Sequence, residues 1–335
     1  MTNISVDVLV IGAGIMGLTT ALSLVRDGMS VRVLARDLPH ATTSCAAGAI
    51  WGPFGTGRHE DARGWAFETL KEFRRLADDP KSGIAMVEGL EVSRVDRPVP
   101  GWLLDVGAEP CDTRDLPSGY RSGWRYETAV IDMPPFLTFL TDELARHGVR
   151  IEQSTVTDLA AVVDQAAVTV NCSGAGARDL ASDRSVRPVG GRVVIVENPG
   201  VHRFFAEFEE GPEMTYLIPH RTCLVLGSTL EEPDQPTSEI ADVTRGILRR
   251  CAAVEPAVAR ARVIGSRRGL RPVRPRIRLE QATVGSRPVV HNYGHGGGGV
   301  SVSWGCAEEV RSIVQRLLHA PRTLNQEPLT EGGSV

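Results

Sequence analysis

The stretch Val6-Asp7-Val8-Leu9-Val10-Ile11-Gly12-Ala13-Gly14-Ile15-Met16-Gly17 decides the fold. A short apolar run leads directly into three glycines spaced as G-x-G-x-x-G, and apolar residues then recur at helical spacing as far as Val25. Ser30 to Leu34 is predicted to be a second strand. The order strand, glycine turn, helix and strand predicts a βαβ unit, with which a doubly wound α/β fold begins.

Each glycine has its own task in such a unit. Gly12 makes the turn, Gly14 lets a pyrophosphate approach the backbone, and Gly17 lets the helix pack closely on the strand. Asp37 lies about 20 residues beyond the last glycine, which is the expected reach to a ribose hydroxyl. The motif therefore predicts a bound dinucleotide, although it does not by itself separate FAD from NAD.

The bulk composition favours small-molecule partners. The 335 residues include 37 basic and 41 acidic side chains, and no long block of one sign suggests nucleic acid or an anionic membrane surface. The six cysteines are scattered without metal-like pairing, so we expect no metal site and a reducing cytoplasm. The first residues do not resemble a signal peptide, and no apolar run is long enough for a membrane span.

The stretch from Val289 to Ala307 predicts a second ligand loop. It opens like a buried strand, passes through the glycines of His295-Gly296-Gly297-Gly298-Gly299, and leads into an apolar-periodic helix. The start of a helix carries unpaired amides and a partial positive charge, so a phosphate or a reduced flavin ring would suit it. The alternative is a tight turn without a ligand, but such a turn needs only one or two glycines.

Between these stretches the pattern alternates between two characters, and we expect both domains to be discontinuous in sequence. Helical and parallel-strand patterns alternate in the nucleotide domain, whereas short strands separated by glycine and proline indicate an antiparallel sheet. The predicted nucleotide domain comprises residues 1–80, 131–185 and 256–320, the substrate domain residues 81–130 and 186–255, and a polar tail residues 321–335.

The segment from Ala41 to Trp51 is rich in small and hydroxyl residues. Such a loop suits close contact with phosphate and with the edge of a ring. It can equally be a helix N-cap followed by an ordinary small-residue helix. Local evidence leaves both interpretations open.

Two side chains suggest recognition of a carboxylate. Six arginines lie between Arg267 and Arg278, and most of them suit a solvated face or a phosphate site. Arg271 stands on a proline-flanked extended segment, where a guanidinium can grip a carboxylate through two parallel hydrogen bonds. Tyr216 opens a strand after the short polar loop 209–213, and its phenol either donates to the same carboxylate or is a core tyrosine with a satisfied hydroxyl.

Together these motifs resemble the D-amino-acid oxidase family of flavoproteins, in its microbial form. Val289-Val290-His291-Asn292-Tyr293-Gly294-His295-Gly296-Gly297, followed by Gly299, Gly305 and Ala307, is similar to the family signature. The strands Gly269-Leu270-Arg271-Pro272 and Tyr216-Leu217-Ile218-Pro219 resemble its substrate-binding strands. The resemblance extends from Val8 to about Leu317 in the right order, which is nearly the whole chain.

The resemblance implies non-covalently bound FAD. The pyrophosphate, adenosine, phosphate and flavin contacts would come from the three segments described above, with an adenine contact after a later strand. The implied cofactor residues are Gly12, Ala13, Gly14, Ile15, Met16, Arg36, Asp37, Thr42, Thr43, Ser44, Ala47, Gly48, Ala49, Val156, Ser173, Gly174, Gly296, Gly297, Gly299, Val300 and Ser301. The implied catalytic residues are Tyr216, Arg271 and Gly297, whose carbonyl would accept from the substrate amine.

The implied reaction is oxidation of D-amino acids by dioxygen to 2-oxo acids, ammonia and hydrogen peroxide, with hydride transfer from Cα to flavin N5, in an enzyme that is often a homodimer. Alternatives are an oxidase acting on glycine, D-aspartate or a specialised-metabolite amine, or a flavin-binding protein without turnover. Arg203, His220 and Arg221 flank the expected lid, where they either favour an acidic substrate side chain or, as is commoner, are simply exposed charges. An NAD-dependent dehydrogenase leaves the C-terminal glycine loop without a role.

Three features depart from the family pattern. The lid before Tyr216 is short and lacks a second tyrosine, and Gly298 replaces a bulkier residue. The C-terminus lacks a peroxisomal tripeptide, so we expect a cytoplasmic protein.

Overall fold

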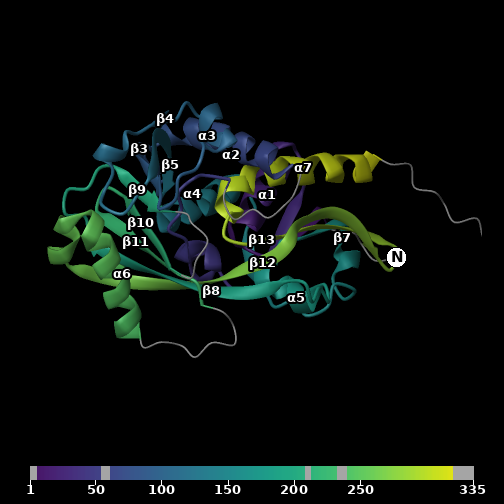
Figure 1. Ribbon diagram of the computed structural model, residues 1–335. Coiled ribbons are helices and arrows are strands. Elements are labelled where there is room, and N and C mark those ends of the chain that lie inside the picture. Colours follow the sequence, from purple (N-terminus) through teal and green to yellow (C-terminus); the bar gives the residue numbers. More distant parts are fainter. Residues whose placement is uncertain (1–5, 54–60, 208–212, 232–239, 320–335) are drawn as a thin grey trace, which may run out of the picture.

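The computed structural model describes residues 6–53, 61–207, 213–231 and 240–319. Two earlier predictions lie outside these ranges: most of the short lid, residues 209–212, and the polar tail, residues 321–335. The described residues form a mixed α/β structure in which one large sheet passes through the molecule, with most of the long helices above it and α5 and α6 apart from them (Figure 1). The predicted α/β class is confirmed.

The sheet contains thirteen strands among the described residues, in the order β4-β5-β3-β9-β10-β11-β8-β12-β13-β7-β1-β2-β6. The strands are β1 Val6–Ile11, β2 Val31–Ala35, β3 Ile84–Ser93, β4 Glu109–Pro110, β5 Ser122–Ile131, β6 Ile151–Gln153, β7 Ala166–Asn171, β8 Arg187–Glu197, β9 Phe204–Glu207, β10 Glu213–Pro219, β11 Cys223–Thr229, β12 Val263–Val284 and β13 Arg287–His295.

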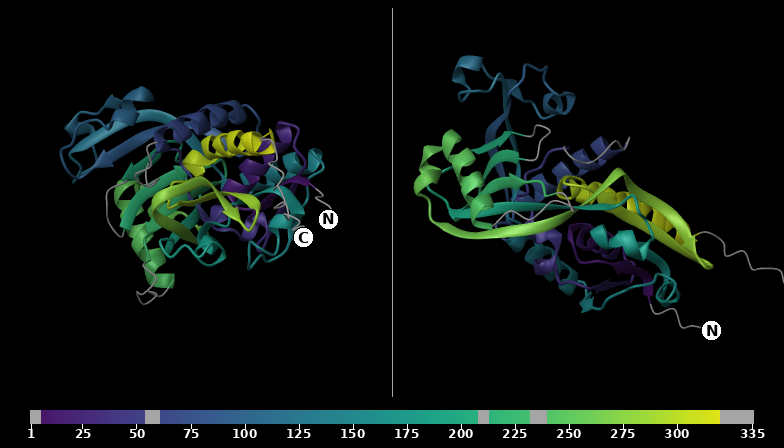
Figure 2. Two further views of the ribbon diagram at one scale, coloured as in Figure 1. Left: turned by 90° about the vertical axis from the view of Figure 1, so that its right-hand side faces the viewer. Right: turned by 60° about the horizontal axis from the view of Figure 1, so that its bottom comes forward.

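The two ends of the sheet differ in strand direction. β13, β7, β1, β2 and β6 run parallel, as the βαβ pattern predicts. From β12 through β8, β11 and β10 to β9 the neighbouring strands are antiparallel, and so are β3 and β5. The regions predicted as two domains therefore share a continuous sheet, which β8 and the 22-residue β12 join. Figure 2 shows β12 extending along much of the molecule.

Helices cover the parallel end of the sheet unequally. The helices are α1 Ile15–Arg26, α2 Ala62–Ala77, α3 Gly101–Asp105, α4 Met133–Arg146, α5 Ala177–Leu180, α6 Ile240–Val254 and α7 Gly299–His319, with 3-10 turns η1 Pro39–Ala41, η2 Thr43–Ala46, η3 Thr113–Asp115, η4 Val163–Gln165, η5 Gly174–Gly176 and η6 Pro256–Arg260. The main core packs α1, α2, α4 and α7 on one face, and residues around η4 cover part of the other.

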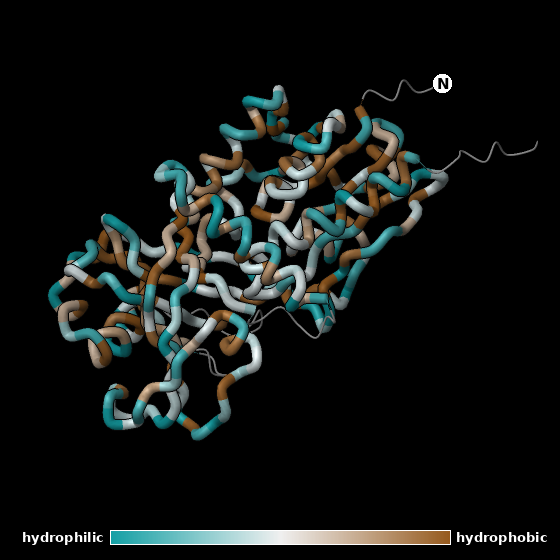
Figure 3. Tube along the Cα trace, turned by 90° about the horizontal axis from the view of Figure 1, so that it is seen from above, coloured by the Kyte–Doolittle hydropathy of each residue, from teal (hydrophilic) through white to brown (hydrophobic). Residues whose placement is uncertain are grey.

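Local sequence explains these elements. Ten of the twelve residues of α1 are buried, because this helix lies between the sheet and α7. Pro134 stands in the first turn of α4, where its missing amide costs no hydrogen bond, and Gly148 follows that helix with a φ of +78°. Hydrophobic residues concentrate along the elements inside the molecule, and hydrophilic residues at its connections (Figure 3). Within the described ranges, no helix is both long and apolar enough to cross a lipid bilayer.

Candidate active site

The N-terminus of α1 is packed so closely that two of its glycines cannot carry a side chain. Gly12 has a φ of +111°, and a Cβ there would lie 2.5 Å from the carbonyl oxygen of Cys172. A Cβ on Gly17 would lie 1.9 Å from the carbonyl oxygen of Gly12. Gly14 precedes the helix without a side-chain cap, so the polarised start of α1 faces the turn. This geometry suits an anionic group such as a pyrophosphate.

The segment containing η1 and η2 connects this helix start to β12. The Ser44 hydroxyl accepts a hydrogen bond from the Ile15 amide at 2.9 Å, and the Thr43 hydroxyl accepts one from the Leu270 amide at 3.2 Å. The segment forms 3-10 turns, so the alternative of an N-capped helix is wrong. Ala49 has a φ of +40°, a backbone conformation that costs energy and concentrates at functional sites.

The residues predicted to contact adenosine follow the carboxyl ends of parallel strands. Arg36 and Asp37 come directly after β2, Val156 lies three residues after β6, and Ser173 lies two residues after β7. Ligands of doubly wound sheets bind at this edge. Arg36 and Asp37 form an exposed ion pair of 2.7 Å with each other.

The C-terminal glycine loop lies between β13 and α7. Gly296 has a φ of +56°, and its amide donates to the carbonyl oxygen of Pro272 on β12 at 3.0 Å. Gly297 is exposed, so its carbonyl is open to a ligand. In the first turn of α7, the Ser301 hydroxyl accepts from the Gly52 amide at 3.2 Å, which ties this helix start to the segment after Ala49.

The Tyr216 side chain comes from β10 and lies flat on the neighbouring strand β11. A Cβ on Gly227, its partner across the ladder on β11, would lie 2.0 Å from the ring carbon that carries the hydroxyl. The hydroxyl reaches the cofactor segment, because a Cβ on Gly48 would lie 2.9 Å from it. Burial raises the pKa of Tyr216, while Arg271 and a hydrogen bond with Ser228 act in the opposite direction, so the phenol stays protonated and can donate.

The Arg271 side chain comes from β12 and lies flat on the neighbouring strand β8. A Cβ on Gly191 would lie 2.0 Å from a terminal nitrogen of the guanidinium. The same nitrogen donates to the carbonyl oxygens of Gly190 and Thr229, both at 3.1 Å. A Cβ on Gly297 would lie 3.7 Å from Cδ of Arg271, so the side chain passes beside the glycine loop.

The three residues predicted to contact a substrate therefore come together. Arg271 lies beside Gly297 and close enough to Tyr216 for each to shift the pKa of the other. Burial lowers the pKa of the guanidinium, and Tyr216 and Glu231 raise it. A partly desolvated cation with a buried phenol beside it is suited to hold a carboxylate.

Gly191 and Gly227 are site residues that the sequence analysis missed. Both lie inside strands, where glycine weakens pairing unless another group needs the space above it. Each provides that space for a side chain of the candidate site. Gly227 lies opposite Tyr216 in the strand pairing, whereas Gly191 pairs with Gly269, two residues before Arg271, so only the strand register reveals either glycine.

One prediction about specificity is wrong. Arg203, His220 and Arg221 do not flank the lid, because they lie at the opposite ends of β9 and β10 from residues 208–212. Arg203 forms an exposed ion pair of 3.6 Å with Glu88. These three residues therefore do not support an acidic substrate side chain.

The donor set fits FAD. The hydroxyl of Ser173 is buried without a hydrogen-bond partner among the described residues, and it belongs to the edge that would meet the adenosine half. The start of α1, where Ser44 accepts from the Ile15 amide, would hold the pyrophosphate, and the glycine loop with the start of α7 would face the flavin ring.

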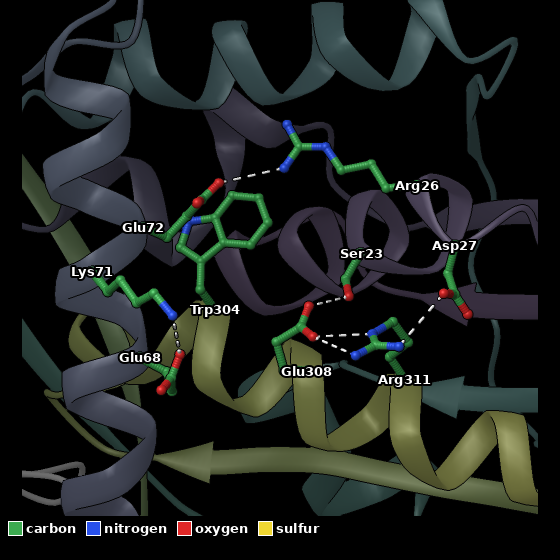
Figure 4. Close-up of a pocket in the computed structure, with 9 residues that line it drawn as sticks. All are labelled: Ser23, Arg26, Asp27, Glu68, Lys71, Glu72, Trp304, Glu308 and Arg311. Atoms are coloured by element: carbon green, nitrogen blue, oxygen red, sulfur yellow. Dashed lines mark hydrogen bonds and ion pairs between the residues drawn. The ribbon is translucent and has the colours of Figure 1, made fainter.

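A pocket of about 380 Å³ lies elsewhere, between α1, α2 and α7 (Figure 4). It adjoins Arg26 at the C-terminal end of α1, whereas the predicted pyrophosphate contacts lie at the N-terminal end. Its charges pair with one another, as in Arg26 with Glu72 at 3.4 Å and Arg311 with Glu308 at 2.8 Å. With three cations and four carboxylates that pair with one another, this pocket is not the predicted site.

Comparison with known proteins confirms the family resemblance. The FAD dependent oxidoreductase family model matches residues 7–313. The chain is 42% identical to a D-amino-acid oxidase of Rubrobacter xylanophilus, over 91% of this chain and 94% of that protein. It is 41% identical to a D-amino-acid oxidase of Streptomyces coelicolor, over 92% and 96%, and 33% identical to a human D-aspartate oxidase, over 94% and 96%.

Solved structures support the same fold. A glycine oxidase from Bacillus cereus superposes with a TM-score of 0.76 at 18% identity, covering 93% of this chain and 95% of that one. The predicted cofactor and the predicted enzyme class, an oxidoreductase, are also confirmed. This chain belongs to the FAD dependent oxidoreductase family.

Proposed function

We propose that this protein oxidises D-amino acids to 2-oxo acids, with release of ammonia and hydrogen peroxide. The observation that carries the proposal is the position of Arg271, which lies on Gly191 with Tyr216 and Gly297 beside it. The D-amino-acid oxidases that the chain resembles over nine-tenths of its length support the choice of substrate. Bound FAD would accept the hydride from the substrate and pass the same two electrons to dioxygen, which becomes peroxide.

The protein contributes mainly orientation. Both hydrogens of one terminal nitrogen of Arg271 donate to the carbonyls of Gly190 and Thr229. Arg271 would therefore grip the substrate carboxylate through Nε and its other terminal nitrogen, in two charge-assisted hydrogen bonds, and Tyr216 would donate a third. The carbonyl of Gly297 would accept from the amine. Fixing both ends of the substrate aims one hydrogen of Cα, and such positioning can lower a barrier by several kcal/mol.

Handedness follows from the same two contacts. If the carboxylate and the amine are fixed, exchange of the other two substituents of Cα replaces its hydrogen by the side chain. An L-amino acid would therefore present its side chain where the D-amino acid presents the reacting hydrogen. The amides at the start of α7 would stabilise the negative charge that develops on the acceptor.

A substrate panel with peroxide detection tests the proposal. We expect peroxide from D-alanine and little from L-alanine. Peroxide only from glycine or only from D-aspartate would replace the proposed substrate class by one of the alternatives. Absence of peroxide with every amino acid, from protein that retains FAD, would leave a flavin-binding protein without turnover.

Three further points belong to the proposal. Dioxygen is the proposed electron acceptor, the cytoplasm the proposed location and a homodimer the proposed assembly.

The proposed domain boundaries are those of the sequence analysis, with residues 81–130 and 186–255 forming the substrate side of the continuous sheet. The segment containing η1 and η2, the edge at Ser173 and the glycine loop are the proposed cofactor contacts.

A further inference from the structure

Gly190 and Gly191 of β8 separate two charged groups on opposite faces of the sheet. Over Gly191 lies the Arg271 guanidinium, in the proposed substrate site. Over Gly190 lies an ion pair between Arg268 and Glu231, because a Cβ on Gly190 would lie 2.8 Å from a carboxylate oxygen of Glu231 and 3.0 Å from Arg268. Both glycines are thus required for space, each on its own face.

The two faces are linked through one backbone carbonyl. Gly190 and Glu231 form an isolated antiparallel bridge in which each amide donates to the other's carbonyl oxygen at 2.8 Å. The carbonyl of Gly190 also accepts from Arg271 at 3.1 Å. The second carbonyl that holds the guanidinium belongs to Thr229, two residues before Glu231. The position of the Glu231 backbone therefore affects both carbonyl oxygens that accept from Arg271.

The Glu231 carboxylate is fixed on the far face. Arg268 donates to it at 2.7 Å, and Arg192 approaches it at 3.8 Å with its side chain 10% exposed. The Arg268 side chain is 42% exposed, whereas those of Glu231 and Arg192 are 18% and 10% exposed. Because an ion pair with an exposed partner adds little to stability, loss of Arg268 should change geometry more than stability.

We propose that Glu231 is a positioning residue for Arg271. Its ion pair with Arg268 fixes the Gly190–Glu231 bridge, and this bridge orients the carbonyls that hold the guanidinium toward the substrate carboxylate. The inference rests on the proposed role of Arg271. It adds a residue on the opposite face of the sheet that contacts neither substrate nor cofactor.

The test compares Glu231→Gln and Arg268→Gln with Glu280→Gln, which breaks an ion pair of 2.6 Å with Arg278 on the same strand, far from the bridge. Steady-state kinetics with D-alanine give KM and kcat. Propionate, a carboxylate without an amine, gives its dissociation constant from the change in the visible spectrum of the bound FAD.

We expect Glu231→Gln and Arg268→Gln each to raise the KM and the propionate dissociation constant about five- to tenfold, with kcat within twofold. The KM and the propionate dissociation constant of the double variant should not exceed those of the more strongly affected single variant, because the two residues act as a pair. Glu280→Gln should change neither constant, and the unfolding midpoints of Arg268→Gln and Glu280→Gln should agree with that of the wild type. Unchanged propionate binding in Glu231→Gln, additive effects, or an equal fall in kcat would overturn the inference.

Arg271→Leu separates the two proposals. If it abolishes propionate binding while Glu231→Gln leaves binding unchanged, only the positioning role fails. If Arg271→Leu leaves propionate binding unchanged, the carboxylate role of Arg271 fails, and the positioning role fails with it.

Discussion

Glu91 is a buried acid whose replacement should stabilise the protein at neutral pH. It lies on β3 with 2% of its surface exposed, and it accepts a hydrogen bond from the Tyr126 hydroxyl at 2.9 Å. The one cation facing it among the described residues is Arg97, at 3.8 Å, which also lies over the Trp124 ring. Burial raises the pKa of Glu91 from 4.5 to about 7, and the contacts with Tyr126 and Arg97 lower it by less.

The sign of the effect follows from proton binding. Between pH 4.5 and about 7 the folded protein binds the Glu91 proton more tightly than the unfolded chain does. The stability that the protonated Glu91 contributes is therefore complete below pH 4.5 and is lost as the pH rises to about 7. The difference between the two pKa values corresponds to about 3 kcal/mol. Glu91→Gln keeps an acceptor for Tyr126 without the buried charge. It should therefore raise the free energy of unfolding at pH 8 by up to about 3 kcal/mol.

The assay is urea unfolding of the FAD-loaded protein from pH 5 to pH 8, at constant free FAD because bound ligand adds its own stability. The matched control is Glu88→Gln on the same strand, whose side chain is 70% exposed. We expect the gain from Glu91→Gln to grow with pH up to about 7, and Glu88→Gln to follow the wild type. A gain independent of pH, or a loss at pH 8, would refute the reasoning.

Two glycine substitutions, Gly305→Ala and Gly227→Ala, test the packing. Their common control is Gly64→Ala, at an exposed helix position where a Cβ would meet nothing within 4 Å. Gly64→Ala should stabilise the protein by about 1 kcal/mol in chemical unfolding. Gly305→Ala should lower the unfolding midpoint, since its Cβ would lie 2.3 Å from the Trp65 backbone; an unchanged midpoint would contradict this packing. Gly227→Ala should reduce kcat/KM for D-alanine at least tenfold while FAD remains bound, because its Cβ would displace Tyr216; wild-type kinetics would contradict the placement of the phenol.

The sequence predicted the parts of the fold that depend on local pattern. The strand, glycine turn and helix at Gly12 and the strand, glycine loop and helix at Gly296 are both present, because positive φ angles and helical periodicity are set by nearby residues. The proline-flanked segment around Arg271 is also a strand. Its length of 22 residues and its pairing with both β8 and β13 depend on distant partners, which no local pattern shows.

The sequence singled out the side chains that the structure brings together in the candidate site, but not the residues that support them. Arg271 and Tyr216 were identified because guanidinium and phenol groups suit a carboxylate. The glycines beneath them, Gly191 and Gly227, have meaning only once the strand register is known. The error over Arg203 has a local cause: the four residues of β9 were not recognised as a strand, and this strand separates Arg203 from residues 208–212.

The most direct test of the central claim is the rate at which substrate bleaches the visible absorption of the bound FAD in the absence of oxygen. Arg271→Leu would be compared with Arg276→Leu, an exposed position on the same strand, using D-alanine and a simple amine without a carboxylate. If Arg271 holds the carboxylate, its loss should slow bleaching by D-alanine about a hundredfold or more, leaving the amine and the Arg276→Leu protein unaffected. Equal slowing for D-alanine and the amine, or no slowing for either, would contradict the claim.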